Sequence, residues 1–123
     1  MQITIFKDIK ETSQPFYRNV EIIIKRIRDG SSKNLVKKIR AEKNKENRNI
    51  LKQKLPAVCF SGTFNKRADS SLQEHSGLIC LDFDGYPSNK IMLMEKEKLS
   101  KDKYIYSVFI SPSGKGLKAL VKI

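Results

Sequence analysis

The stretch Leu78-Ile-Cys-Leu-Asp-Phe-Asp84 decides how the fold is interpreted, because a mostly apolar run passes directly into two carboxylates. Side chains of a strand alternate between faces, so Asp82 and Asp84 point to one side and Phe83 to the other. Two carboxylates at the end of a buried strand repel each other and lose hydration, and a cation relieves both costs. Oxygen ligands suit Mg²⁺ or Mn²⁺. The spacing therefore predicts a metal site, with a polar turn at Asp84-Gly85 as the alternative.

A second segment with chemical potential is Ser111-Pro-Ser-Gly-Lys-Gly-Leu-Lys118. Its glycines and serines let the backbone approach a ligand closely and aim N–H groups at an anion, while Lys115 and Lys118 add charge suited to phosphate. The spacing is not that of a Walker A loop, and we expect a strand rather than a helix to follow. An acidic strand end that faces this hairpin would have the minimal equipment for nucleotidyl transfer. An ordinary turn is the alternative.

The rest of the chain alternates short strands with helices. We expect strands at residues 2–6, 57–61, 77–83, 104–110 and 117–123, and a polar loop at 62–71. This order predicts an α+β fold, with a mixed or antiparallel sheet of short strands and an N-terminal helical pair.

The first helix is expected to start near Pro15 and to end at Asp29-Gly30, with Val20, Ile23, Ile24 and Ile27 on its apolar face. Ser31 or Ser32 is expected to cap the second helix. Residues 40–50 are almost all polar and predict either an exposed helix or a mobile basic loop. A further helix is expected at 87–100. Its candidate core residues are Ile91, Leu93, Met94 and Leu99.

Length and charge fit a single domain, residues 1–123, with a basic part at 1–54 and a motif-bearing part at 55–123. The formal net charge is +12, and residues 1–55 hold 15 Lys and Arg against 6 Asp and Glu. This excess is compatible with binding to a phosphate backbone, and equally with a lysine-rich solvated surface. No apolar run has membrane-spanning length, and residues 1–8 lack the basic-then-apolar pattern of a signal peptide, so we expect none there.

The two cysteines, Cys59 and Cys80, lie in apolar strand-like runs without Cys or His at metal-ligand spacing. We interpret both as reduced, buried thiols of a cytoplasmic protein.

Four segments, taken in order, resemble the VirE-type N-terminal domain. They are Leu55-Pro56, Phe60-Ser-Gly-Thr-Phe64, Ser76-Gly-Leu-Ile-Cys-Leu-Asp-Phe-Asp84 and Ser111-Pro-Ser-Gly-Lys-Gly-Leu-Lys118. That family is common in Bacteroidetes, their phages and mobile elements, often ahead of a helicase-like region. It looks related to the archaeo-eukaryotic primase superfamily. The resemblance is strong over residues 50–123 and implies a primase-like (RRM-like) core.

By this resemblance, Asp82 and Asp84 are the catalytic metal ligands, for Mg²⁺ or Mn²⁺. The residues implied to bind nucleotide phosphates are Ser111, Ser113, Lys115 and Lys118, with His75 and Arg67 as accessory candidates. A lysine stands at 118 where many primases have histidine. The third primase motif, an apolar residue followed by Asp, is not in the sequence. We therefore expect a domain that is incomplete at its C-terminus and inactive alone.

The resulting hypothesis is a primase-like domain of a phage or mobile-element replication protein, with DNA or RNA, nucleotides and a helicase-like region or protein as partners. Its complete form would be a nucleotidyltransferase. One alternative is a non-catalytic nucleic-acid-binding module. Another is a fragment of a haloacid-dehalogenase-type phosphatase, because Leu81-Asp-Phe-Asp-Gly85 resembles the nucleophile motif of that family. The phosphatase alternative requires a doubly wound domain of more than about 100 residues after the motif.

Overall fold

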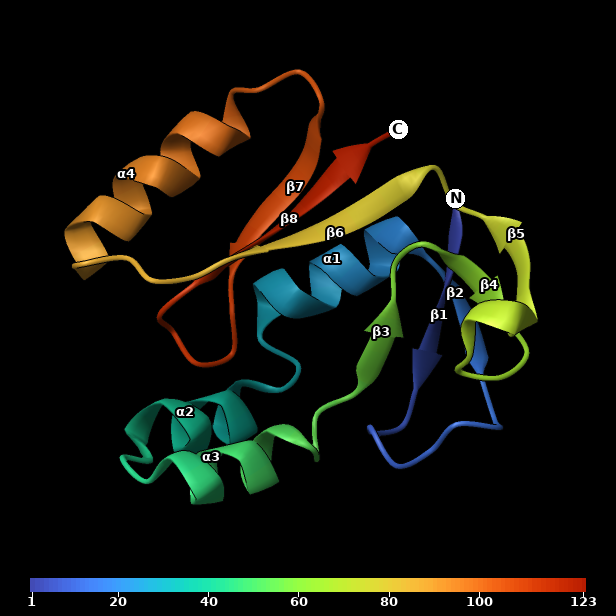
Figure 1. Ribbon diagram of the computed structural model, residues 1–123, viewed down its shortest axis with the longest axis horizontal. Coiled ribbons are helices and arrows are strands. Elements are labelled where there is room, and N and C mark those ends of the chain that lie inside the picture. Colours follow the sequence, from blue (N-terminus) through green and yellow to red (C-terminus); the bar gives the residue numbers. More distant parts are fainter. The chain divides into compact units, whose positions relative to one another are not determined.

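The computed structural model describes all residues from Met1 to Ile123 and has the predicted α+β fold. The chain divides into two compact units, Met1–Gly77 and Leu78–Ile123. Figure 1 shows the elements of both. The boundary falls directly before the strand that carries the two aspartates, so both predicted motifs lie in the second unit.

The first unit is built around a three-stranded antiparallel sheet of order β2-β1-β3 and a separate hairpin, β4-β5. The strands are β1 (Gln2–Phe6), β2 (Phe16–Asn19), β3 (Ala57–Cys59), β4 (Gly62–Phe64) and β5 (Leu72–His75), with a 3₁₀ turn at Asp69–Ser71. The central strand β1 is buried from Ile3 onward. The unit's core therefore lies around β1.

The buried hydroxyl of Thr4 joins β1 to β4. It donates a hydrogen bond to the carbonyl oxygen of Gly62 and accepts one from the backbone N–H of Phe64, both at 2.9 Å. The expectation of a plain loop over 62–71 is therefore wrong, because residues 62–64 form a strand that Thr4 and the hairpin partner β5 both bind.

Three helices complete the first unit: α1 (Val20–Asp29), α2 (Lys33–Ala41) and α3 (Lys45–Lys52). The helix start expected near Pro15 is wrong, since residues 16–19 first pair with β1 as strand β2. The Asn19 side chain then caps α1 by accepting the N–H of Glu21 at 3.1 Å. Gly30 ends α1 in the left-handed conformation, as the Asp-Gly pair predicted. The polar stretch at 40–50 spans the end of α2 and most of α3, which has no buried residue.

The second unit carries one sheet and one helix. Its elements are β6 (Leu78–Phe83), α4 (Asn89–Ser100), β7 (Ile105–Ile110) and β8 (Leu117–Lys122). The sheet order is β6-β8-β7, and both pairings are antiparallel. The central strand β8 buries Leu117, Ala119 and Leu120. All three strands were predicted, and helix α4 packs against β7 and β8.

The expected core face of α4 is wrong. Met92, which was not among the candidates, is the buried residue, whereas Ile91, Leu93 and Met94 are 45 to 54% exposed. Leu99 is half-buried. It follows Met92 by seven residues, a spacing that places both on the same face of the helix. Apolar residues surround the start of this helix, so their positions alone did not show which face meets the sheet.

None of the helices combines the length and the apolar character that a membrane span requires. Both cysteines are free thiols, as expected. Cys59 is half-buried, but Cys80 is exposed, which corrects its expected burial. The physical reason is its place on β6, a strand at the edge of its sheet.

Candidate functional site

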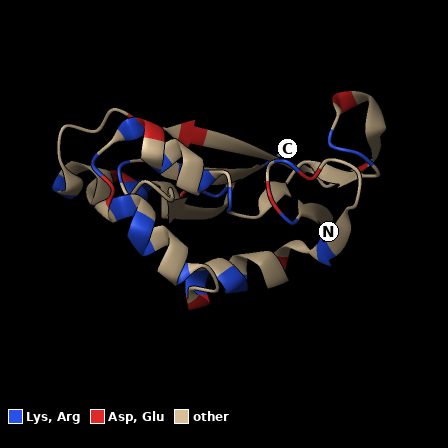
Figure 2. Cartoon of the chain, turned by 90° about the horizontal axis from the view of Figure 1, so that it is seen from below, with Lys and Arg blue, Asp and Glu red and all other residues tan.

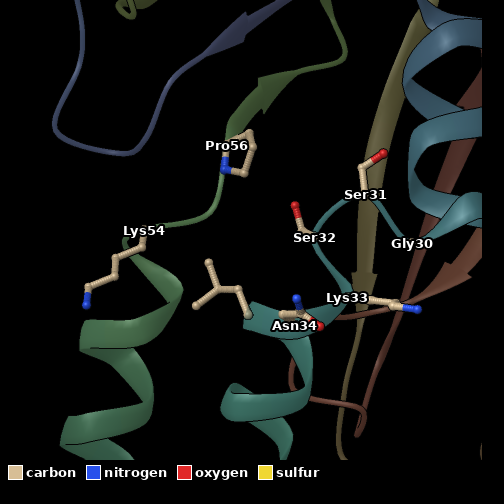
Figure 3. A pocket seen from close by; sticks show the side chains of 8 residues that line it. Gly30, Ser31, Ser32, Lys33, Asn34, Lys54 and Pro56 are labelled. Carbon is tan, nitrogen blue, oxygen red and sulfur yellow. The ribbon is translucent and has the colours of Figure 1, made fainter.

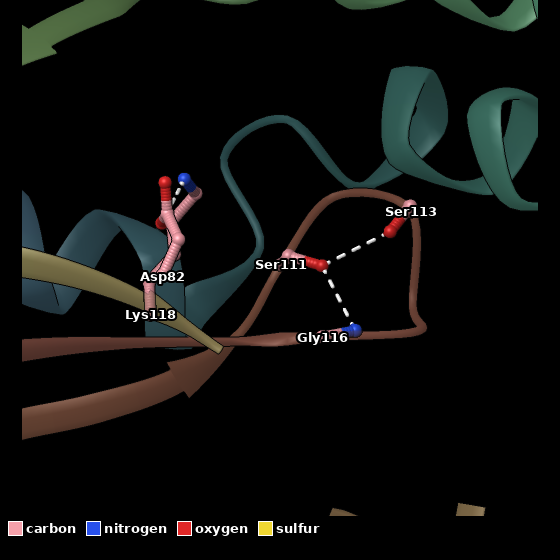
Figure 4. A network of polar contacts seen from close by, with 5 residues as sticks. All are labelled: Asp82, Ser111, Ser113, Gly116 and Lys118. Atoms are coloured by element: carbon pink, nitrogen blue, oxygen red, sulfur yellow. Dashed lines mark hydrogen bonds and ion pairs between the residues drawn. The ribbon is translucent and has the colours of Figure 1, made fainter. Parts of the chain in front are cut away.

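The two predicted motifs meet in the β6–β8 ladder. Asp82 and Lys118 are direct cross-strand partners, and the Lys118 ammonium nitrogen lies 2.7 Å from the Asp82 Oδ1 atom (Figure 4). Directly paired residues point to the same face of a sheet, which brings the two charges together. Because both side chains are partly exposed, the pair contributes at most about 1 kcal/mol to folding stability. Its main effect is to compensate the charge of Asp82.

Asp84 lies just beyond β6, beside Gly116 of the β7–β8 hairpin. A Cβ atom added at Gly116 would collide with the Asp84 carboxylate and would lie 2.8 Å from the carbonyl oxygen of Phe83. Glycine is therefore required at 116 by the close approach of the two segments. Gly85, which follows Asp84, has a φ of 79°. The chain therefore also turns at Asp84-Gly85, where the alternative interpretation placed a polar turn.

The hydroxyl groups of the hairpin bind within the hairpin itself. Ser111 Oγ lies 3.0 Å from Ser113 Oγ and accepts the N–H of Gly116 at 3.3 Å, as Figure 4 shows. Ser113 Oγ accepts the N–H of Lys115 at 3.4 Å, and the Gly114 N–H donates to the Ser111 carbonyl at 2.9 Å. Several of the N–H groups expected to face an anion thus have partners inside the loop. The exposed Lys115 side chain is the loop's most accessible cationic group.

The residues present do not make a resident metal centre by themselves. No group of three or more His, Cys, Asp and Glu side chains lies together in residues 1–123. Of the two predicted ligands, Asp82 already holds the ammonium group of Lys118. A lysine at this distance adds positive charge that disfavours a second cation.

Two uncharged titratable groups border these charges. The pKa of the Cys80 thiol is raised because neighbouring protein atoms partly desolvate the thiolate, although the residue as a whole is exposed; Lys118 opposes this shift and Asp82 adds to it. The pKa of the Tyr86 hydroxyl is raised, first by desolvation and then by Glu95 and Asp84. The charges available to a ligand near β6 at neutral pH therefore come from the carboxylates and the lysines.

The accessory candidates His75 and Arg67 belong to the first unit. His75 Nδ1 accepts the N–H of Gly77 at 2.9 Å, and the Arg67 guanidinium donates to the carbonyl oxygen of Ile9. Both side chains thus make contacts local to their own unit.

One pocket of the first unit was not anticipated. It has a volume of about 510 Å³ and lies where the link between α1 and α2 approaches Pro56 (Figure 3). The side chains of Lys33 and Lys54, which contribute to its lining, extend away from the space between Ser32 and Pro56. The Gly30-Ser31-Ser32 segment indicated only a helix boundary in the sequence. None of the predicted site residues lines this pocket.

The fold and site define a class: an α+β protein whose antiparallel sheet presents an Asp–Lys pair beside a Ser/Gly hairpin. The chain belongs to the family of BT4734-like N-terminal domains, whose family model matches residues 50–123. The match includes strand β6, the hairpin and strand β8. No curated protein matches the chain, and no solved structure does.

Proposed function

We propose that the second unit, Leu78–Ile123, binds phosphate groups of nucleic acids or nucleotides as a primase-like module. The observation that supports this most is the place of Lys118. Its ammonium group has three N–H donors, and the bond to Asp82 uses one of them. The carboxylate thus holds the lysine in place, and the remaining donors suit phosphate oxygens. Lys115, on the adjacent hairpin, supplies a second charge.

The charge of the helical segment favours a nucleic acid over a free nucleotide as the ligand. Residues 20–54, which contain α1 to α3, hold twelve Lys and Arg against four Asp and Glu. Figure 2 shows the Lys and Arg positions along the chain, with fewer Asp and Glu between them. Such an excess attracts a phosphate backbone and makes binding depend on salt.

Context for the proposal comes from the resemblance of residues 50–123 to VirE-type N-terminal domains and, through them, to primases. In this proposal the chain is the nucleic-acid-binding part of a phage or mobile-element replication protein. Phosphate binding of this kind requires no resident metal. We assign no nucleotidyl transfer to residues 1–123, because two carboxylates, one of them paired with lysine, fall short of a metal site. The phosphatase alternative finds no support in a sheet that is antiparallel throughout.

The test is fluorescence anisotropy of a labelled single-stranded oligonucleotide titrated with the full chain at two salt concentrations. We expect Lys115→Ala/Lys118→Ala to weaken binding by roughly tenfold, which corresponds to about 1.4 kcal/mol. The matched control is Lys101→Ala/Lys103→Ala, which removes the same charge from the exposed segment between α4 and β7. We expect the control to weaken binding by about threefold or less. Equal losses in the two variants would mean that only net charge matters and would reject the site.

A further inference from the structure

The outer edge of strand β6 is unusually open for a natural sheet. β6 has a partner, β8, on one side only. On this edge strand Ile79 is 37% exposed and Leu81 is 41% exposed, and Cys80 between them is exposed as well. Between Ile79 and Phe83 the strand combines apolar side chains with the outward-facing backbone groups of a sheet edge.

Natural proteins usually protect such edges with lysine, proline or a bulge. Residues 78–83 contain no Lys or Pro, and their pairing with β8 runs through all six residues without a register shift. The one charge on the strand, Asp82, is compensated by Lys118. The opposite edge differs, since the β7–β8 pairing shifts register between Ile105 and Ser107. Such an irregularity is one of the devices that hinder edge pairing, whereas the pairing of β6 with β8 is regular along the whole strand.

We propose that two copies of this chain associate through β6, edge to edge and antiparallel, to form one continuous six-stranded sheet. The strand is self-complementary in the way that a two-fold axis demands. With the axis at Cys80, Ile79 of each copy lies opposite Leu81 of the second copy, and Cys80 faces Cys80. Asp82 then lies opposite Leu78, so no like charges meet.

This arrangement explains the exposed residues of the strand. The apolar side chains of Ile79 and Leu81 gain cross-strand partners, and the open backbone groups gain hydrogen bonds. The two Asp82–Lys118 pairs would lie on the same face of the sheet. From the rise per residue and the spacing between strands, the Asp82 Cα atoms of the two copies would be roughly 14 Å apart. Pairing at this strand edge does not depend on phosphate binding.

The first test is the molar mass of the full chain by sedimentation equilibrium over a range of concentrations. We expect the unmodified chain to dimerise and Leu81→Lys to weaken the dimer by at least about tenfold, because a lysine at an edge opposes pairing. Ile91→Lys is the matched control, since Ile91 is 45% exposed but lies on α4, and it should leave the dimer intact. A monomer at all concentrations, or equal dissociation in both variants, would overturn the proposal.

The second test holds even if Leu81→Lys fails to fold. Directly opposite residues of antiparallel strands have Cα atoms about 4.5 to 5.5 Å apart, which is within the range of a disulfide. Copper-phenanthroline oxidation of Cys59→Ser, which keeps only Cys80, should give a covalent dimer. Cys80→Ser, which keeps only the half-buried Cys59, should stay monomeric on denaturing gels. No dimer from Cys59→Ser, or equal cross-linking of Cys80→Ser, would contradict the pairing.

Discussion

The Nζ atom of Lys118 lies 2.7 Å from Oδ1 of Asp82, and the two residues are direct partners across strands β8 and β6. This relationship changes the meaning of the Asp-x-Asp motif. A bare pair of carboxylates would call for a metal ion, whereas a carboxylate that already holds a lysine is electrically satisfied. The lysine in turn is presented at a defined place on the sheet, where it can meet an anion.

Replacement of Lys118 by an uncharged residue should therefore strengthen the binding of a metal ion to Asp82 and Asp84. We predict that Lys118→Met binds Mn²⁺ about fivefold to tenfold more tightly than the unmodified chain, because a positive charge beside Asp82 is lost. Isothermal titration with Mn²⁺ alone measures this. Asp82→Asn/Lys118→Met should return to weak binding. Tighter binding by the unmodified chain than by Lys118→Met would show that the lysine does not oppose the metal.

We expect that adding even one methyl group at position 116 destabilises the fold. Gly116→Ala places a methyl group against the Asp84 carboxylate and the Phe83 carbonyl, so we expect a loss of about 1 to 3 kcal/mol in the free energy of unfolding. Urea denaturation followed by circular dichroism measures it. Asp84→Ala in the same chain should recover part of the loss, because one of the two obstacles is gone. Full stability of Gly116→Ala would disprove the close approach.

We expect the hydroxyl group of Thr4 to contribute substantially to folding stability. Thr4→Val keeps the shape but leaves the Gly62 carbonyl and the Phe64 N–H without this buried partner, so we predict a loss of about 1 to 3 kcal/mol in the free energy of unfolding. Thr63→Val, at the half-buried neighbour on β4, is the control and should change stability by less than about 0.5 kcal/mol. Similar losses in both variants would argue against the bridging role of Thr4.

The two thiols predict how stability falls at alkaline pH. Partial desolvation by surrounding protein atoms raises the pKa of both the half-buried Cys59 and the more exposed Cys80 above the ordinary value of 9.0. The unfolded chain therefore releases these protons first, and the free energy of unfolding decreases as the pH rises past about 9. Urea midpoints measured between about pH 8 and pH 10 should decline less in Cys59→Ser/Cys80→Ser than in the parent chain. A steeper decline in the variant would reverse the sign of the expected linkage.

The sequence was sufficient for the parts of the fold that have a continuous local signal. Strands β6 and β8 and the hairpin before β8 are such parts, because apolar runs are bounded by Gly, Ser and Asp. Strands β2, β4 and β5 were missed, since each has only three or four residues and is held by pairing with another strand. Short segments of this kind are set by tertiary pairing rather than by local propensity.

The candidate site shows the same division. The residue types at 82, 84, 115 and 118 were found from the sequence, but the pairing of Asp82 with Lys118 was not, because it depends on the register between strands 36 residues apart. Likewise, the contact of Gly116 with Asp84 depends on where the hairpin closes. Register is fixed by the pairing of the whole strand and is not visible in a motif.

The most direct test of phosphate binding at this site is an NMR titration of the isotopically labelled chain with a short single-stranded oligonucleotide. We predict that the largest amide shifts occur at residues 82–84 and 111–118, with smaller salt-dependent shifts at residues 20–54. Lys115→Ala/Lys118→Ala should abolish the first set and retain the second. Shifts confined to residues 20–54, with the β6 end and the hairpin unmoved at saturation, would contradict the proposed site.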